Sequence, residues 1–190
     1  MTLTHGYRKE RILPYIFAYG SLIEQASRSK STPSTLYVLP AKVHGYARGW
    51  WHRTGGIGRS TTFLGAVPEK ASSINGVIYA VDKAELDATD GREEGYERVI
   101  VSHLEILSGG SKPEGEIYIY LDKFEEGPTR DFPIVQSYVD ICLTGCLQIE
   151  KGFPDVYDFS VDFIKTTQKW PEYWENDRQY PRRGDLLDQP

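Results

Sequence analysis

Short apolar runs and alternations dominate the first two thirds of the chain, and apolar residues recur at helical spacing along the last third. The first run, residues 15–17, follows Pro14 and consists of the aromatic and β-branched types that suit a buried strand. Further strands are predicted at residues 41–51, 62–67, 76–81, 98–106 and 116–121. Residues 24–40 are rich in Ser, Thr and Pro, which predicts a surface loop with room for a short helical turn.

Helices are predicted by capping and by periodicity. Asp82 and Glu85 have the spacing of an N-cap pair, which predicts a short helix at residues 83–90. Apolar positions at helical spacing predict a longer helix at residues 133–149, and another helix is predicted at residues 160–169. Strands followed by helices indicate an α+β fold with a mixed, curved or barrel-like β-sheet and a few flanking helices.

The first strand ends at Gly20 and Ser21. Glycine permits a backbone conformation closed to other residues, and a strand that breaks in this way exposes successive backbone N–H groups. One interpretation is therefore a cradle for an anion or an oxyanion, and the alternative is an ordinary Gly-Ser turn. A second glycine-rich stretch, residues 54–58, is followed by residues typical of a strand, which favours a hairpin over a phosphate-binding loop.

Length and composition restrict the class of protein. The 190 residues suit one domain, with a core at about residues 14–165 and a tail at residues 170–190 rich in aromatic residues and arginine. The formal net charge of −5, with no block of Lys or Arg, argues against nucleic acid as a partner. No apolar run approaches the roughly 18 residues of a membrane helix. The polar first residues lack the apolar core of a signal peptide, so a cytoplasmic location is expected.

The two cysteines, Cys142 and Cys146, lie one helical turn apart. They form no disulfide framework, and no second pair of ligands accompanies them, so they are interpreted as small buried side chains rather than as a metal or redox site. The four histidines are scattered without the spacing of metal ligands.

Several motifs follow one another in the order of a known family. Residues 17–22 (FAYGSL), 43–48 (VHGYAR), 76–81 (GVIYAV) and 90–98 (DGREEGYER) resemble, in turn, the YGS motif, the GY-x-R strand, the strand before the catalytic loop and the D-x-R-E-x-G-Y-x-R segment of the γ-glutamylcyclotransferase-like superfamily, in its bacterial and ChaC-like branches. Pro133, Tyr138, Gly145 and residues 152–154 are similar to its late helix. The resemblance covers roughly residues 16–165.

The resemblance implies a catalytic glutamate. A register anchored on Gly95, Tyr96 and Arg98 places Glu93 in that position. A second register, which matches residues 86–91 to a Leu-Asp-x-x-Glu-Gly pattern, places the shorter Asp90 there instead. Glu93 is preferred because more flanking residues agree, with Asp90 as the alternative and Glu94 after it.

The chemistry that the resemblance implies is an intramolecular cyclisation of a γ-glutamyl amide. The α-amino group attacks the γ-carbonyl, closes 5-oxoproline and releases an amine, amino acid or peptide. Because the nucleophile is already part of the substrate, the enzyme mainly holds the folded-back conformer. One carboxylate can move the protons, and the reaction requires no metal or cofactor.

The predicted substrate-binding residues are Tyr19, Gly20, Ser21, Leu22, Tyr138 and Arg48. Each tyrosine could equally be a buried residue with a satisfied hydroxyl, and structural pairing within the sheet is the favoured reading of Arg48. Two other functions stay open: a non-catalytic module that binds a small acidic ligand, and hydrolysis or transfer of the γ-glutamyl group without cyclisation. The tail rich in Trp and Arg could cap the pocket, and packing over the sheet is the favoured alternative.

Overall fold

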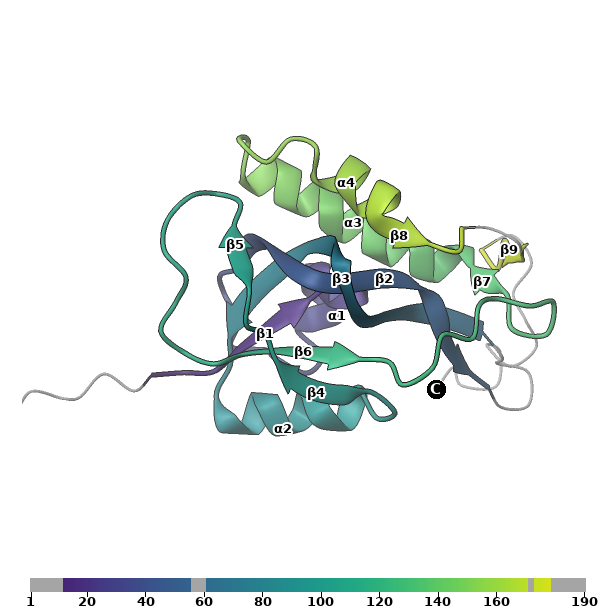
Figure 1. The fold of residues 1–190 in the computed structure, drawn as a ribbon, viewed down its shortest axis with the longest axis horizontal. Coiled ribbons are helices and arrows are strands. Elements are labelled where there is room, and N and C mark those ends of the chain that lie inside the picture. The colour runs from purple at the N-terminus through teal and green to yellow at the C-terminus, as the bar shows by residue number, and fades with distance from the viewer. Residues whose placement is uncertain (1–11, 56–60, 171–172, 179–190) are drawn as a thin grey trace, which may run out of the picture.

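The computed structural model describes residues 12–55, 61–170 and 173–178. Its centre is a mixed sheet of seven strands in the order β4-β6-β1-β3-β2-β5, with β8 paired to β2. The strands are β1 (Tyr15–Ala18), β2 (Leu39–Thr54), β3 (Thr61–Ala80), β4 (Glu97–Ile100), β5 (Leu104–Ile106), β6 (Ile117–Leu121) and β8 (Thr167–Gln168). The sheet is curved and does not close (Figure 1). The α+β fold with a curved mixed sheet is therefore confirmed, and the curved alternative is the one realised.

Strand β1 is the centre of this sheet. It pairs antiparallel with β3 and parallel with β6, so a short strand of four residues has neighbours on both sides. Ile16, Phe17 and Ala18 are almost completely buried, as expected for apolar residues in a central strand. The chain leaves the sheet immediately after them, so the turn that follows is anchored to the core.

Two strand predictions differ from the structure. Strand β3 is continuous, whereas two strands separated by a polar connection were expected. Residues 68–71 are exposed, and the β2–β3 register shifts between His44 and Tyr46, so polarity here marks a strand segment projecting into solvent with a bulge. The strand expected at residues 98–106 is divided into β4 and β5, which pair with β6 and β2 at opposite edges of the sheet.

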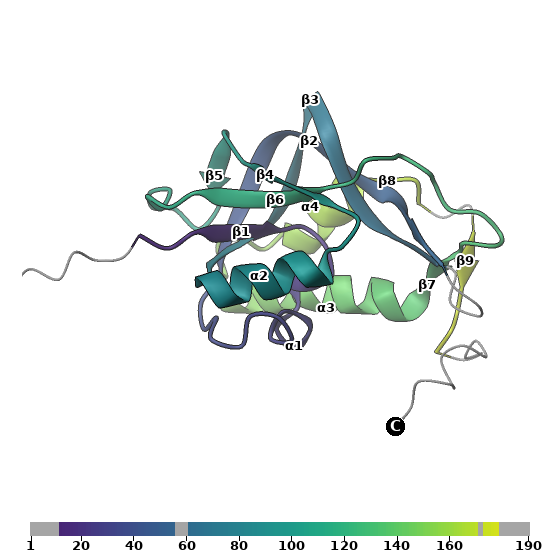
Figure 2. The same ribbon diagram turned by 90° about the horizontal axis from the view of Figure 1, so that it is seen from below.

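The helices are α1 (Gln25–Arg28), α2 (Lys83–Arg92), α3 (Gln136–Gly152) and α4 (Phe159–Thr166), with a 3₁₀ turn η1 (Ser21–Ile23) directly after β1. The predicted capping box of α2 is confirmed: the Asp82 carboxylate accepts from the Glu85 amide, and the Glu85 carboxylate accepts from the Asp82 amide. Figure 2 shows α1, α2 and α3 on one side of the sheet. None of the described helices is long and apolar enough to cross a bilayer.

Buried apolar side chains drawn from residues 16–163 form one large core cluster. The described part of the tail packs beside this core: the ring of Trp170 lies edge-on to that of Trp50, with ring centroids 5.1 Å apart. Further along the tail, β9 (Trp174–Glu175) pairs in parallel with β7 (Ile134–Val135) as a two-stranded sheet. Residues 179–190 of the tail and residues 56–60 of the expected hairpin connection lie outside the described residues.

Candidate active site

The turn after β1 forms one wall of a small cavity of about 40 Å³. Its lining includes Tyr19, Gly20, Ser21, Leu22, Glu93 and Tyr138. Arg28 braces this turn from within the protein, because its buried guanidinium donates to the carbonyl oxygens of Leu22 (3.1 Å) and Ile23 (2.9 Å). The structure thus brings together all but one of the predicted substrate-binding residues with the preferred catalytic residue.

Glu93 reaches the cavity because α2 ends directly before it. Its backbone N–H still donates to the Thr89 carbonyl (2.9 Å), while its own carbonyl accepts from the Tyr96 amide (3.0 Å). Gly95, which lies between Glu93 and Tyr96 in the chain, has a φ of +104°, a conformation that favours glycine. The chain turns there toward β4. The Glu93 side chain is left 19% exposed.

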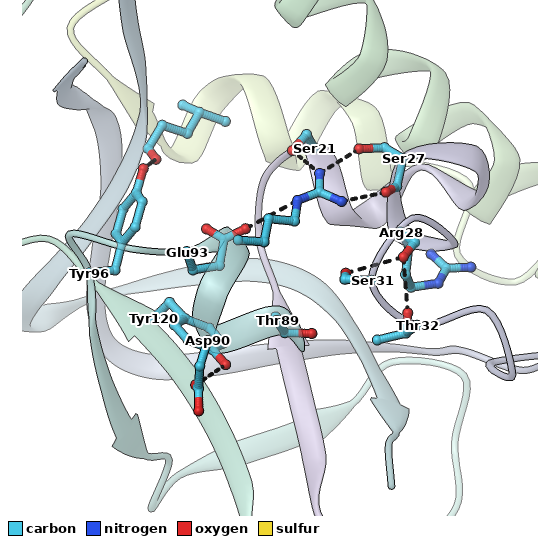
Figure 3. A network of polar contacts seen from close by, with 12 residues as sticks. Ser21, Ser27, Arg28, Ser31, Thr32, Thr89, Asp90, Glu93, Tyr96 and Tyr120 are labelled. Carbon is cyan, nitrogen blue, oxygen red and sulfur yellow. Dashed lines mark hydrogen bonds and ion pairs between the residues drawn. The ribbon is translucent and has the colours of Figure 1, made fainter. Parts of the chain in front are cut away.

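Burial raises the pKa of Glu93 above its usual value, although the electrostatic interactions with Arg92 and then His52 act in the opposite direction. Arg92 also links Glu93 to the turn. Its Nε lies 3.5 Å from the Glu93 carboxylate, and its Nη2 donates to the Ser27 hydroxyl (2.8 Å) and contacts the Ser21 hydroxyl (3.5 Å). Figure 3 shows this network, with Glu93 on one side and Ser21 and Ser27 on the other.

Tyrosines surround the carboxylate. The Tyr19 hydroxyl donates to the Tyr120 carbonyl (2.6 Å), and the Tyr96 hydroxyl donates to the Leu64 carbonyl (2.9 Å). Burial raises the pKa of Tyr19, Tyr96 and Tyr138 well above the usual value, so all three stay neutral. Tyr138 is held by edge contacts with the rings of Trp50 (5.9 Å) and Phe63 (4.7 Å).

Asp90, the alternative catalytic residue, points elsewhere. Its carboxylate accepts hydrogen bonds from the Tyr120 hydroxyl (2.7 Å) and from Arg98 (2.6 Å), and its side chain is 38% exposed. In Figure 3 it points toward Tyr120 and away from Ser21. Asp90 does not line the cavity. Its geometry is that of a carboxylate joining α2 to the sheet.

Arg48 is the one predicted substrate-binding residue that lies outside the cavity. Its guanidinium is completely buried and donates to protein groups only: the carbonyls of Tyr19 (3.2 Å), Asn75 (2.8 Å) and Phe163 (2.8 Å), the Asn75 side chain, and the hydroxyls of Thr166 and Thr167. Burial lowers its pKa to about 10, which still leaves it charged at neutral pH. The geometry favours the structural reading, in which Arg48 secures the base of the turn at Tyr19.

A second, outer cavity of about 410 Å³ adjoins the first and shares Ser21, Glu93, Tyr96 and Tyr138 with it. Its further lining includes Lys30, His52 and Arg92. Glu94 also lines it and is exposed. Glu93 therefore stands where a small cavity meets a larger one, a shape that suits a compact group attached to a variable one.

Motif reading alone did not single out Arg92, Tyr96 or His52 as cavity residues. Arg92 and Tyr96 occur within the D-x-R-E-x-G-Y-x-R segment, so the motif contained a signal for them. For His52 no motif gave a signal, because its place beside Glu93 depends on the pairing of β2 and β3.

The comparison with protein families matches residues 16–137 to the γ-glutamyl cyclotransferase, AIG2-like family. The chain belongs to this family. The match runs from the first strand through Glu93 to the start of α3, so the family resemblance drawn from the motifs is confirmed, and the match specifies no branch. A search of curated protein sequences found no significant match.

Solved structures share the fold. A γ-glutamyl cyclotransferase is similar over 87% of this chain and 95% of its own (TM-score 0.62, 15% identity). An uncharacterized human protein is similar over 94% and 100% (TM-score 0.63, 14% identity). A yeast γ-glutamyl cyclotransferase specific to glutathione is similar over 85% and 98% (TM-score 0.50, 15% identity).

Proposed function

We propose that this protein is a γ-glutamylcyclotransferase-like enzyme that releases 5-oxoproline from a γ-glutamyl amide, with Glu93 as the general acid and base. The observation that carries the proposal is the position of the Glu93 carboxyl in the cavity formed by the Tyr19–Leu22 turn. Membership of the γ-glutamyl cyclotransferase family supports the same reaction class.

In this mechanism the γ-glutamyl group occupies the inner cavity and its substituent extends into the outer one. Glu93 takes a proton from the α-ammonium group, and the freed amine attacks the γ-carbonyl. A carboxylate with a raised pKa is better suited to accept that proton than an ordinary glutamate, and general acid–base catalysis of this kind contributes about 10²–10⁴ in rate. Backbone N–H groups near Gly20 and Ser21 would hold a substrate oxygen.

The neutral tyrosines fit this role. Tyr138, whose pKa is strongly raised, can donate a hydrogen bond without adding negative charge beside Glu93. Tyr138 spans both cavities and is the tyrosine best placed to contact the substrate near its scissile amide. Arg92 keeps the carboxylate close to the turn and supplies a positive charge next to it.

The test is Glu93→Gln, assayed with a panel of γ-glutamyl dipeptides, γ-glutamylamines and glutathione and scored for 5-oxoproline. We expect kcat to fall by about 10²–10⁴ while substrate Kd, measured calorimetrically, stays nearly unchanged, because glutamine keeps the shape but cannot take the proton. Asp90→Asn is the matched control and should keep its activity. Full activity of Glu93→Gln would remove the proposed mechanism.

Product analysis separates the other functions. Free glutamate in place of 5-oxoproline would indicate hydrolysis, and binding of γ-glutamyl ligands by the unaltered protein without any product would indicate a binding module. Either result would contradict cyclotransferase activity.

A further inference from the structure

A carboxylate–imidazole pair lies beside the candidate active site. His52, near the end of β2, has its Nδ1 3.3 Å from the Oδ2 atom of Asp122, the residue after β6. The side chains are 16% and 4% exposed. That Oδ2 accepts no hydrogen bond from a described residue, and His52 Nδ1 is the polar atom that approaches it. A buried carboxylate oxygen with a single partner strongly favours a proton on the facing Nδ1.

The backbone around Asp122 is shaped for this pair. The Asp122 amide donates to the Ala66 carbonyl (2.8 Å), and its Oδ1 accepts from the Phe124 amide (3.3 Å). The carboxylate lies against Gly65, where a Cβ atom would come within 2.7 Å of Oδ2. Any larger residue at position 65 would therefore displace the carboxylate from His52.

The other side of the imidazole faces the site. His52 lines the outer cavity together with Glu93, and its ring stacks on Tyr96 with centroids 4.1 Å apart. The Cε1–Nε2 edge lies next to Gly95, where a Cβ atom would be 3.3 Å from Cε1 and 3.7 Å from Nε2. With Nδ1 3.3 Å from Asp122, Nε2 is the ring nitrogen left to serve the cavity, and no hydrogen bond joins it to a described residue.

We propose that His52, oriented by Asp122, is a second catalytic residue that donates a proton from Nε2 to the leaving nitrogen. This inference rests on the proposed cyclotransferase function and divides the proton transfers between two groups. Glu93, between the cavities, serves the attacking amine, while His52, in the outer cavity, serves the departing one. Asp122 is a positioning residue that acts through His52.

Each proton in the proposed reaction has a defined source and destination. Glu93 takes one proton from the α-ammonium, the amine nitrogen bonds to the γ-carbon, and the carbonyl electron pair moves to oxygen. When that pair returns, the bond to the leaving nitrogen breaks with its electrons, and that nitrogen takes the Nε2 proton of protonated His52. The ring nitrogen releases its extra proton to water, the free amine takes one from water, and the proton on Glu93 recharges His52.

The experiment uses two substrates that differ in their need for a proton donor. An alkylamine leaves only when protonated, whereas 4-nitroaniline is a far better leaving group. His52→Gln should therefore lower kcat on γ-glutamyl-ethylamide by about 10²-fold or more, and on γ-glutamyl-4-nitroanilide by less than about tenfold. Asp122→Asn should show the same selectivity with a smaller loss. The variants are first checked by thermal unfolding.

The matched control is His44→Gln. His44 lies on the same strand and also faces a carboxylate, Glu105 at 3.8 Å, but its side chain is 50% exposed and it lines neither cavity. The His44→Gln variant should leave kcat unchanged on both substrates. An equal loss on both substrates in His52→Gln and Asp122→Asn would overturn the inference, because it indicates a structural role while the cyclotransferase function stands. Failure of the unaltered protein to release 5-oxoproline from either substrate would instead remove the proposed function and the inference with it.

Discussion

Two carboxylate–arginine pairs stand at the end of α2, three residues apart in the chain and facing different surroundings. The outer pair joins Asp90 to Arg98 at 2.6 Å, with a further hydrogen bond from Tyr120. The inner pair joins Glu93 to Arg92 at 3.5 Å, and the arginine directs its remaining donors to Ser27 and Ser21. The outer carboxylate is twice as exposed as the inner one, at 38% against 19%.

The difference shows how one helix end can hold a structural acid and a candidate catalytic acid together. Each oxygen of the Asp90 carboxylate accepts a hydrogen bond from a side chain of the sheet, Arg98 or Tyr120, so this group is engaged by the protein itself. A carboxylate that is buried beside a looser partner keeps a raised pKa and can exchange protons with what enters the cavity. The two acids are only three residues apart in the sequence. Their burial and the distances to their arginine partners are what distinguish them.

The largest expected effect is on the pH dependence of activity when each of the two arginines is replaced. Since Arg92 lowers the pKa of Glu93, Arg92→Gln should raise that pKa further and move the acid limb of the kcat/KM profile to higher pH. A shift of one unit would reduce activity on that limb by about tenfold. Arg98→Gln, which disturbs only the outer pair, should leave the limb in place. An equal shift of the acid limb in both variants would contradict the difference between the inner and the outer carboxylate–arginine pair.

The sequence was sufficient to predict the segments that end in this site. The strand at residues 15–17 and the capping box at Asp82 and Glu85 rest on local signals, whereas the choice of Glu93 over Asp90 rests on a register of the family resemblance. Gly95 is an anchor of that register, and the structure shows that its positive φ turns the chain after Glu93. The register anchored on Gly95 and Tyr96 places a glutamate at the cavity, although its catalytic role stays a prediction.

Contacts between distant residues could not be predicted in the same way. Arg48 carries the same charge whether it binds a substrate or the carbonyl of Tyr19, and only the packing of β2 against α4 shows which groups surround it. The continuous β3 was missed because its polar residues 68–71 resemble a loop, although they are an exposed part of a strand. His52 and Asp122 are 70 residues apart and meet only through the sheet.

A smaller effect is expected from removing the outer carboxylate. Asp90→Asn weakens its pairing with Arg98 and alters its bond to Tyr120, which joins α2 to β6. Because the group is more than one third exposed, we expect the free energy of unfolding to fall by only about 1 kcal/mol. Urea denaturation measures this loss, and 5-oxoproline release should stay at the level of the unaltered protein. A loss of activity without a loss of stability would transfer the catalytic role to Asp90.

The smallest effect is a pH-dependent difference in stability between Glu93→Gln and the unaltered protein. The folded pKa of Glu93 lies above its unfolded value, so the folded state binds the proton more tightly and stability falls as pH rises through that window. Glutamine resembles the protonated acid at every pH. The variant should therefore match the unaltered protein at acidic pH and be the more stable of the two at neutral pH, in urea denaturation at both. A variant that is less stable at neutral pH would mean that the attraction of Arg92 outweighs burial, and that the inner carboxylate is as structural as the outer one.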